Sequence, residues 1–186
     1  MARIDQLLES YRRRVSLPLQ ANLPLSQRVW FVVYPPEEER RLVNKIAEFE
    51  IATRDKGLDW RRLDFTGAFA DWMDTFDPDE REECLADVEI IESYAKPGFV
   101  DFLTVQLRGE LEAVAGNAAD NTVIAVSGLM DLYDFVHVSD ILESLDNHLQ
   151  GIVVLFFPGE REGNTYRFLD ARTGWNYLAL PILPED

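Results

Sequence analysis

Two stretches of the chain are continuously apolar over the length of a strand, Val29 to Tyr34 and Gly151 to Phe157. They are rich in β-branched and aromatic residues, and such runs are typical of strands that are buried on both faces of a parallel sheet. Shorter runs predict four further strands, at residues 60–65, 122–127, 166–170 and 175–181. The turn residues 171–174 predict that the last two strands form a hairpin.

Helical periodicity fills most of the chain between these strands. Residues 3–15 place five apolar side chains on one face, which predicts an amphipathic helix: Ile4, Leu7, Leu8, Tyr11 and Val15. A second helix is predicted to begin at Pro36 and to end near Gly57, since proline suits a first helical position and glycine follows helix ends. Further helices are predicted near 66–76 and over 82–94, 98–114 and 140–149.

This order of elements predicts an α/β fold. Strands that alternate with helices indicate a three-layer structure, in which a mainly parallel sheet is flanked by helices and crossovers are right-handed. The C-terminal hairpin should add an antiparallel edge. We expect one α/β domain over residues 1–186, with residues 1–27 as an N-terminal helix and linker, because the chain has neither an internal repeat nor a low-complexity tract.

The formal net charge of −16 is unevenly distributed. Residues 1–28 carry five arginines and two acidic residues, whereas residues 71–92 carry ten acidic residues and one arginine. Duplex DNA is bound mainly through cations on the protein, so the charge argues against direct nucleic-acid binding and favours a basic partner surface. The alternative is an acidic surface whose charges are simply solvated.

The sequence predicts a cytoplasmic protein without membrane contact. Cys84 is the sole cysteine, so an intramolecular disulfide and a multi-cysteine zinc site are both excluded. The polar N-terminal residues do not form a signal peptide, and no apolar run approaches the roughly 18 residues that span a bilayer.

A search for catalytic patterns predicts no catalytic, cofactor-binding or metal-binding residue. None of the three lysines follows a glycine-rich turn between a strand and a helix, so a phosphate-binding loop is missing. Ser127 lacks the flanking glycines of a nucleophile elbow. His137 and His148 are too few and too far apart in the sequence for a metal site, and His137, within Phe-Val-His-Val, is predicted to be a core histidine.

Three segments are candidate binding surfaces. The first is the N-terminal helix, where Leu7, Leu8 and Tyr11 would form a docking stripe beside Arg12. The alternative is that this stripe belongs to the core, because helical periodicity marks an apolar face without naming what covers it. The second candidate is the acidic stretch 71–92, which would attract a basic partner.

The third candidate follows the apolar strand that ends at Phe157. Residues 158–166 combine turn residues with alternating charges, and a charged loop on a rigid strand end is a good place for a binding site. The residues predicted to bind a partner here are Pro158, Gly159, Glu160, Arg161, Asn164 and Tyr166. The alternative is a simple connection between two strands.

Several segments resemble the BrxB family of the BREX phage-defence gene cluster. The N-terminal part of the resemblance is carried by Arg-Val-Trp-Phe-Val-Val-Tyr at 28–34, Glu-Phe-Glu-Ile-Ala-Thr-Arg at 48–54 and Trp-Arg-Arg-Leu-Asp-Phe-Thr at 60–66. The most specific part is Leu-Phe-Phe-Pro-Gly-Glu at 155–160, followed by Asn-Thr-Tyr-Arg-Phe-Leu-Asp-Ala-Arg-Thr-Gly-Trp-Asn-Tyr-Leu-Ala at 164–179. The resemblance is weakest over residues 77–121.

The resemblance implies a non-enzymatic accessory protein that acts as a scaffold or regulator of a BREX anti-phage complex. The family's gene cluster also encodes PglZ, an alkaline-phosphatase-like protein, and the resemblance makes PglZ the first choice among the other BREX proteins as a partner. No catalytic residues are carried over from the family. The alternative is a degenerate nucleotide-binding fold that still binds a nucleotide or nucleic acid. The sequence leaves the oligomeric state open.

Overall fold

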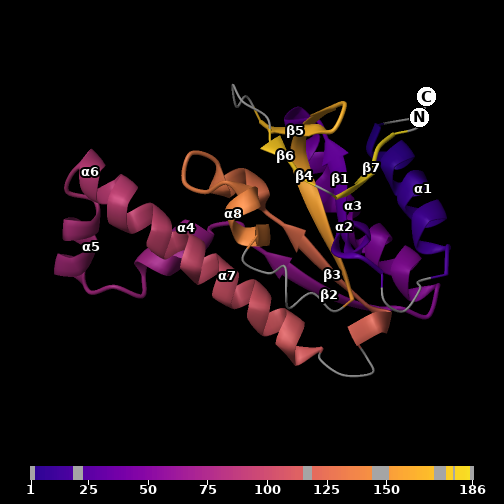
Figure 1. The fold of residues 1–186 in the computed structure, drawn as a ribbon, viewed down its shortest axis with the longest axis horizontal. Helices are drawn as coiled ribbons and strands as arrows, with labels where there is room; N and C mark the ends of the chain where they lie inside the picture. The colour runs from indigo at the N-terminus through magenta and orange to yellow at the C-terminus, as the bar shows by residue number, and fades with distance from the viewer. Residues whose placement is uncertain are drawn as a thin grey trace.

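The computed structural model describes residues 3–18, 23–114, 119–143, 151–169, 175–177 and 179–184. Figure 1 shows a twisted sheet with helices on both faces and a helical arm that extends away from it. The main sheet has the strand order β2-β3-β4-β1-β7, and every neighbouring pair in it is parallel. The α/β fold with a mainly parallel sheet, predicted from the sequence, is confirmed.

The strands of the main sheet match the predicted runs closely. Their bounds are β1 Val29–Tyr34, β2 Asp59–Asp64, β3 Thr122–Ser127, β4 Ile152–Glu162 and β7 Leu180–Ile182. β1 lies between β4 and β7 and is buried along its entire length. The two most apolar runs, β1 and the first part of β4, are therefore adjacent at the centre of the sheet, where both faces are covered.

The helices divide between the two faces of the sheet. One face is covered by α1 (Arg3–Val15) and α3 (Glu39–Arg54), and the other by α4 (Ala68–Met73), α7 (Lys96–Ala113) and α8 (Val138–Glu143). The chain crosses the sheet one way from β1 to β2 and returns from β2 to β3, so crossovers of one handedness place α3 and α7 on opposite faces. The short helix α2 (Leu25–Arg28) leads into β1.

Alternate residues of β1 serve two separate hydrophobic cores. Phe31 and Val33 pack in the core beneath α4 and α7, whereas Trp30 and Val32 pack in the core beneath α1 and α3. Successive side chains of a strand point to opposite faces of the sheet. When both faces are covered by a core, every side chain of the strand is buried and is therefore apolar. The double coverage explains the unbroken apolar run in the sequence.

The C-terminal part of the chain differs from the predicted single hairpin. β4 bends out of the main sheet and pairs in antiparallel fashion with β5 (Thr165–Phe168), which in turn pairs with β6 (Trp175–Asn176). The run predicted as one strand at 175–181 is divided between β6 and β7, and β7 returns to the main sheet parallel to β1. The predicted turn at 171–174 lies outside the described residues.

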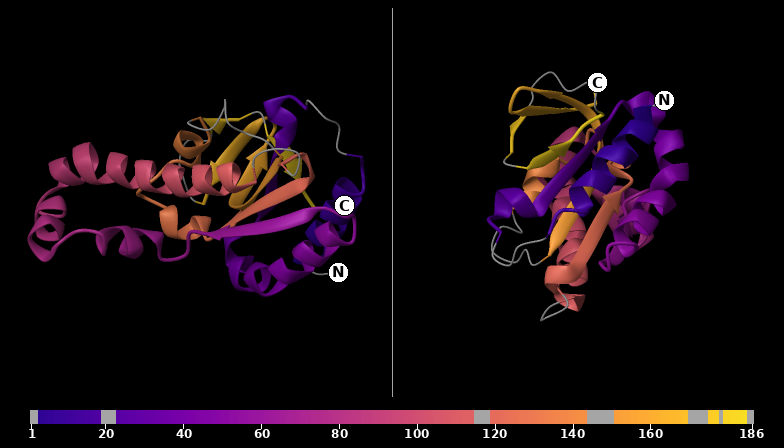
Figure 2. Two further views of the ribbon diagram at one scale, coloured as in Figure 1. Left: turned by 90° about the horizontal axis from the view of Figure 1, so that it is seen from below. Right: turned by 90° about the vertical axis from the view of Figure 1, so that its right-hand side faces the viewer.

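Between β2 and β3 the chain forms the arm that stands out in Figure 2. After α4 come α5 (Pro78–Cys84) and α6 (Val88–Ile90), and a π-helical turn at Ile91–Ala95 then leads directly into α7. The C-terminal part of α7 packs on the sheet through Leu103, Leu107 and Leu111, but α5 and α6 lie beyond the sheet edge. We call residues 74–95 the arm tip.

Candidate partner-binding surface

In open α/β sheets ligands bind at the carboxyl ends of the strands. The carboxyl edge of the main sheet is therefore the expected position of a ligand site. Helix α3 begins just beyond β1, where a phosphate-binding loop would lie. The connection is instead Pro35-Pro36-Glu37-Glu38, in which two prolines lack a backbone N–H group and two side chains are anionic. The Tyr34 hydroxyl donates a hydrogen bond to the Glu39 carboxylate at the start of the helix.

A second group of carboxylates closes the ends of β2 and β3. Asp64 accepts hydrogen bonds from the backbone N–H and the hydroxyl of Thr66, at 3.1 and 2.7 Å, and pairs with Arg62 at 2.7 Å. Asp131 accepts a bond of 2.7 Å from the Gly67 N–H. These bonds fix the loops that follow the two strands, so the Asp64 and Asp131 carboxylates serve the fold.

The pKa values of Glu39 and Asp64 shift in opposite directions. Burial raises the pKa of Glu39, and Asp131 and Asp64 raise it further, against a lowering effect of the bond from Tyr34. Burial alone would also raise the pKa of Asp64, but the bonds from Thr66 and the charge of Arg62 bring it below its ordinary value. An edge lined by carboxylates repels phosphate groups, which is the opposite of an anion cradle.

The N-terminal helix α1 does not offer an exposed apolar face. Leu7 and Tyr11 are fully buried and Leu8 is nearly so, because α1 packs against α3 and the sheet. The predicted docking stripe is therefore an internal contact, and the alternative of a core helix describes the structure. Arg12 is exposed and pairs with Glu9 at 2.8 Å, as a solvated helix face does.

The predicted binding loop at 158–166 is a strand and a hairpin. Pro158 and Gly159 are buried residues of β4, and a Cβ atom at position 159 would lie 2.1 Å from the Arg167 carbonyl oxygen of β5. The glycine is thus required by the close approach of two strands. Tyr166 is also buried, and Asn164 is exposed in the turn.

The charges of this hairpin are largely engaged with one another. Glu160 pairs with Arg167, and the Arg161 guanidinium lies over the Tyr166 ring, 5.9 Å from its centroid. Acidic and basic side chains alternate around the adjoining cavity of about 780 Å3, which is lined by Arg3, Glu37, Glu160, Arg161, Glu162 and Arg167. The mixture of signs gives this cavity no clear preference for a charged partner.

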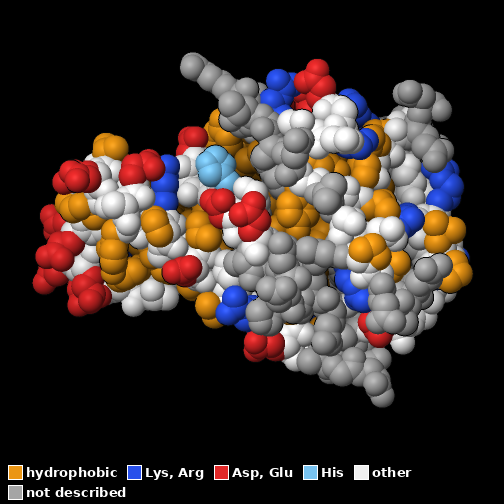
Figure 3. All heavy atoms as spheres, in the orientation of Figure 1, with side chains coloured by type: hydrophobic (Ala, Val, Ile, Leu, Met, Phe, Trp, Pro, Cys, Tyr) orange, Lys and Arg blue, Asp and Glu red, His pale blue; other side chains and the backbone are white. Residues whose placement is uncertain are grey.

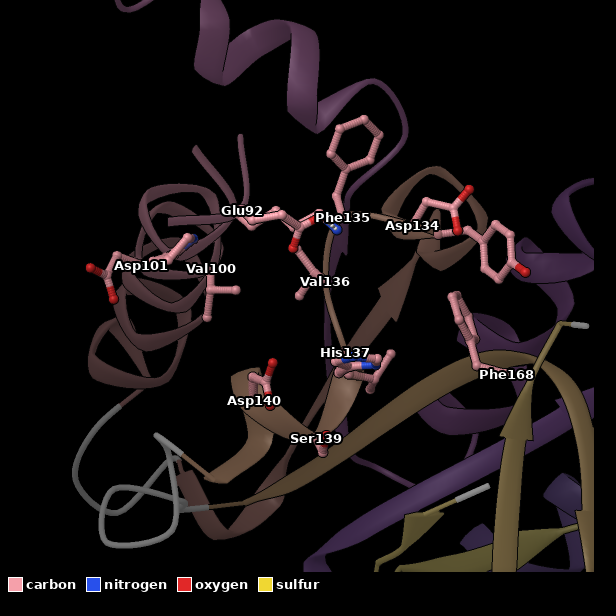
Figure 4. A pocket seen from close by; sticks show the side chains of 14 residues that line it. Glu92, Val100, Asp101, Asp134, Phe135, Val136, His137, Ser139, Asp140 and Phe168 are labelled. Carbon is pink, nitrogen blue, oxygen red and sulfur yellow. Dashed lines mark ion pairs between the residues drawn. The ribbon is translucent and has the colours of Figure 1, made fainter. Parts of the chain in front are cut away.

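A larger groove of about 890 Å3 lies where the arm joins the body. Figure 4 shows Val100 on the α7 wall, with His137 and Phe168 on the opposite side. Most of the rest of the lining comes from the segment between β3 and α8 and from the first turn of α8: Tyr133, Asp134, Phe135, Val136, Val138, Ser139 and Asp140. The groove is therefore built by the arm base, the β3–α8 connection and β5 together.

The groove has an acidic and aromatic lining. Asp134 and Asp140 contribute negative charge, and Lys96 is paired with Glu92 at 2.7 Å. His137 is exposed at the groove, so the prediction of a core histidine is wrong. The reason is that the Phe-Val-His-Val segment is a connection, in which Val136 and Val138 supply the buried contacts on either side. His148 lies outside the described residues.

The arm tip carries apolar side chains that nothing in the described chain covers. Val88 and Tyr94 are 73% and 58% exposed, and Leu85 is also exposed. Beside them is a pocket of about 350 Å3, and its lining combines two acidic residues with apolar ones: Phe76, Glu80, Glu83, Cys84, Ala86, Ile90 and Tyr94. Figure 3 shows acidic side chains gathered at the free end of the arm, with hydrophobic side chains between them.

Local hydrogen bonds shape the arm tip, and buried Cys84 and Ala95 join it to the core beneath α4 and α7. Asp77 caps α5 in a capping box with Glu80, and Asp87 caps α6 through the Ile90 N–H at 2.9 Å. Arg81 reaches back to Asp74 at 3.3 Å. These bonds give the tip a defined conformation, so its apolar side chains are presented on ordered helices.

Comparison of the chain with protein-family models, with curated proteins and with solved structures found no match. The resemblance to BrxB therefore stays a prediction from the sequence. Over the described ranges, no cluster of three His, Cys, Asp or Glu side chains is arranged to hold a metal ion. No helix within those ranges is long and apolar enough to cross a membrane.

The sequence predicts helices and an excess of acidic residues for this region, but not that it projects from the sheet as an arm. The acidic stretch 71–92 was one of three predicted surfaces, and it is the one whose apolar residues the structure leaves exposed. The groove at the arm base was not predicted. Its lining comes from segments far apart in the sequence, and only the Asp and aromatic residues that follow β3 could have pointed to it.

Proposed function

We propose that this protein is a non-enzymatic accessory component of a BREX anti-phage defence complex, acting in the cytoplasm as a scaffold or regulator. Its partner is another BREX protein, with PglZ the first choice. The family assignment is supported by the residues quoted above, chiefly the stretch from Leu155 to Ala179. That stretch builds β4, the antiparallel strands and the approach to β7, so the resemblance concerns a structural part of the fold.

The exposed apolar side chains of the arm tip are the main support for a binding role. A helical projection with exposed Val88 and Tyr94 has a cost in water, since each square ångström of exposed apolar surface is worth about 25 cal/mol on burial. Contiguous apolar surface ringed by polar groups marks interaction sites on soluble proteins. In protein–protein interfaces, a few central side chains buried on such a surface contribute most of the binding free energy.

The alternative of a degenerate nucleotide-binding fold draws its support from the parallel sheet alone. Fold likeness does not carry function without a site. The carboxyl edge weighs against it, because Glu39, Asp64 and Asp131 lie near the position that phosphates would take. Binding of a basic protein surface agrees better with the charge of the chain.

Co-purification from cells that express the complete BREX cluster tests the proposal. The tagged chain should recover one other BREX component in stoichiometric amount, PglZ above all, and a high-salt wash should reduce the yield because the surface is charged. Recovery of the tagged chain alone, at low as well as high salt, would contradict the proposal.

A further inference from the structure

We infer that the arm tip binds a cationic amphipathic segment of a partner protein, with an apolar side chain seated in the pocket beside Tyr94 and lysine or arginine residues against the surrounding carboxylates. The identity of the partner as a BREX component rests on the proposed function. The chemistry of the occupant rests only on the surface itself.

The pocket fits a side-chain anchor. Its volume of about 350 Å3 is near the lower end of the range of about 300–1,000 Å3 that small-molecule sites span. Phe76 and Ile90 form half-buried walls, and Val88 and Leu85 extend the apolar surface outside the cavity. An amphipathic helix or strand can place one large apolar residue in the pocket and others along this surface, as in grooves that receive helices.

The charge around the pocket selects a cationic occupant. Residues 71–92 contain ten acidic residues and one arginine. Some of these acids are used within the arm, as Asp77 is by its capping box. Glu82, Glu83 and Glu89 are exposed, and none of the ion pairs seen in the described residues involves them. Their field falls off over roughly 10 Å at 0.1 M salt, so it acts mainly on groups docked at the pocket.

The same charge disfavours other occupants. DNA, RNA and anionic lipid surfaces carry the same sign as the tip. Binding to them depends on cations, and the one arginine of the tip, Arg81, is paired with Asp74. A second copy that docked tip to tip would bring two acidic stretches together at a cost in repulsion. A cationic protein segment satisfies both the apolar pocket and the carboxylates.

The direct test is a fluorescence-anisotropy titration of the full chain. The probe is a labelled helical peptide of about 14 residues, with leucine on one face and lysine on the other. Two tip variants remove the two kinds of contact, Val88→Glu/Tyr94→Glu for the apolar surface and Glu82→Lys/Glu83→Lys for the charge. Each should weaken binding of the peptide by about tenfold or more.

Matched controls make the same chemical changes elsewhere. Ile51→Glu/Val105→Glu alters two exposed apolar residues, one of α3 and one of α7, that are outside the tip pocket. Asp55→Lys/Glu112→Lys makes the same change in net charge as the double glutamate variant. Both controls should bind the peptide as the wild type does. A peptide with alanine in place of leucine should bind at least about tenfold more weakly, because it lacks the anchor.

The outcomes separate this inference from the proposed function. Equal weakening by tip and control variants would overturn the inference, because the peptide would then be responding to net charge alone. Co-purification of a BREX protein that the tip variants leave unchanged would also overturn it, while the proposed function would stand. A dimer of the wild type in analytical ultracentrifugation that Glu82→Lys/Glu83→Lys dissociates would identify a second copy as the occupant instead. If no BREX protein co-purifies, the proposed function fails and the peptide titration decides the inference by itself.

Discussion

The hydroxyl groups of Tyr11 and Thr53 lie 2.6 Å apart and join the N-terminal helix α1 to α3. Both residues are fully buried, and the Tyr11 ring also packs against Trp30 and Phe49. Burial raises the pKa of Tyr11 despite the opposing effect of its bond to Thr53, so the phenol stays neutral throughout the physiological range. The buried apolar face of α1, to which this bond adds, makes the helix an integral layer of the fold.

Replacement of Leu7 tests the role of α1 in the core. Leu7→Asp buries a charge without a partner and should destabilise the protein by about 3–5 kcal/mol or more, which is enough to prevent cooperative folding. Tyr11→Phe should cost only about 1 kcal/mol, because Thr53 keeps its bond to the Phe49 carbonyl. Thermal and urea denaturation followed by circular dichroism measure both effects.

Arg12→Ala is the matched control on the exposed face of the same helix, and it should change stability by no more than about 0.5 kcal/mol. A Leu7→Asp variant that unfolds at the same temperature as the wild type would show that α1 is dispensable for the fold. The stripe would then be free to act as the docking surface that the sequence suggested.

Helical periodicity could identify the apolar face of α1 but not its neighbour. A stripe that packs on its own sheet and a stripe that awaits a partner have the same spacing of leucines. The acidic arm presents the converse problem, because Val88 and Tyr94 lie among charges and follow no strong period in the sequence. Their exposure follows from the path of the chain beyond the sheet, which depends on where α7 packs.

The strands could be predicted because β1 and β4 are apolar on both faces, which only a covered parallel sheet requires. The division of residues 175–181 into β6 and β7 could not be predicted, because it depends on β4 bending away from the main sheet to pair with β5. Likewise, Pro158 and Gly159 resembled a turn in the sequence, although hydrogen bonding to β5 keeps them extended.

Gly128 should be far less tolerant of alanine than Gly57. Both have positive φ angles, +76° and +74°, so alanine would be strained at either position by about 1–2 kcal/mol. A Cβ atom at Gly128 would also lie 2.3 Å from the Thr66 backbone nitrogen, whereas nothing lies within 4 Å at Gly57. Urea denaturation of the two variants measures the difference, and equal losses of stability would show that the β2 and β3 loops do not approach as described.

The carboxylates at the sheet edge predict opposite effects of neutralisation. The pKa of Glu39 is raised in the folded state, so the folded chain holds the proton more tightly and loses stability as pH rises through and above the ordinary value of 4.5. Glu39→Gln should therefore stabilise the protein at pH 7, by less than about 1 kcal/mol because the group is only partly shielded from solvent. The gain should disappear near pH 3, where the glutamate is protonated in both states.

Asp64 provides the control of opposite sign. Its pKa is lowered in the folded state, so it contributes stability above its ordinary value of 3.8 that is lost as pH falls through the folded value. Asp64→Asn should destabilise the protein at pH 7 and have less effect in acid. Thermal melts from pH 3 to 8 measure both variants, and a destabilising Glu39→Gln at pH 7 would contradict the view that the Glu39 charge is unfavourable.

The acidic edge also predicts the outcome of ligand titrations. Calorimetry with ATP, GTP and short DNA should give no binding heat up to about millimolar ligand, because arginines at the described carboxyl edge, such as Arg62 and Arg167, are paired with carboxylates. Saturable binding of a nucleotide would favour the degenerate nucleotide-binding fold.

The arm-tip substitutions should separate binding from folding. Val88 and Tyr94 are exposed, so Val88→Glu/Tyr94→Glu should leave the free energy of unfolding within about 0.5–1 kcal/mol of the wild type. Urea denaturation measures this. A large loss of stability would mean that these side chains support the fold of the arm itself. Glu82→Lys/Glu83→Lys would then be the variant with which partner binding is tested.

We propose a docking role for this chain, in which its arm engages another BREX component. Its most direct test is quantitative co-purification of the tagged wild type and of Val88→Glu/Tyr94→Glu from cells that express the complete BREX cluster. We expect stoichiometric recovery of one partner, PglZ first, with the wild type. The variant should lose about nine-tenths or more of that partner, as a tenfold or greater weakening implies below saturation. Recovery of the wild-type chain without any BREX protein would contradict the account.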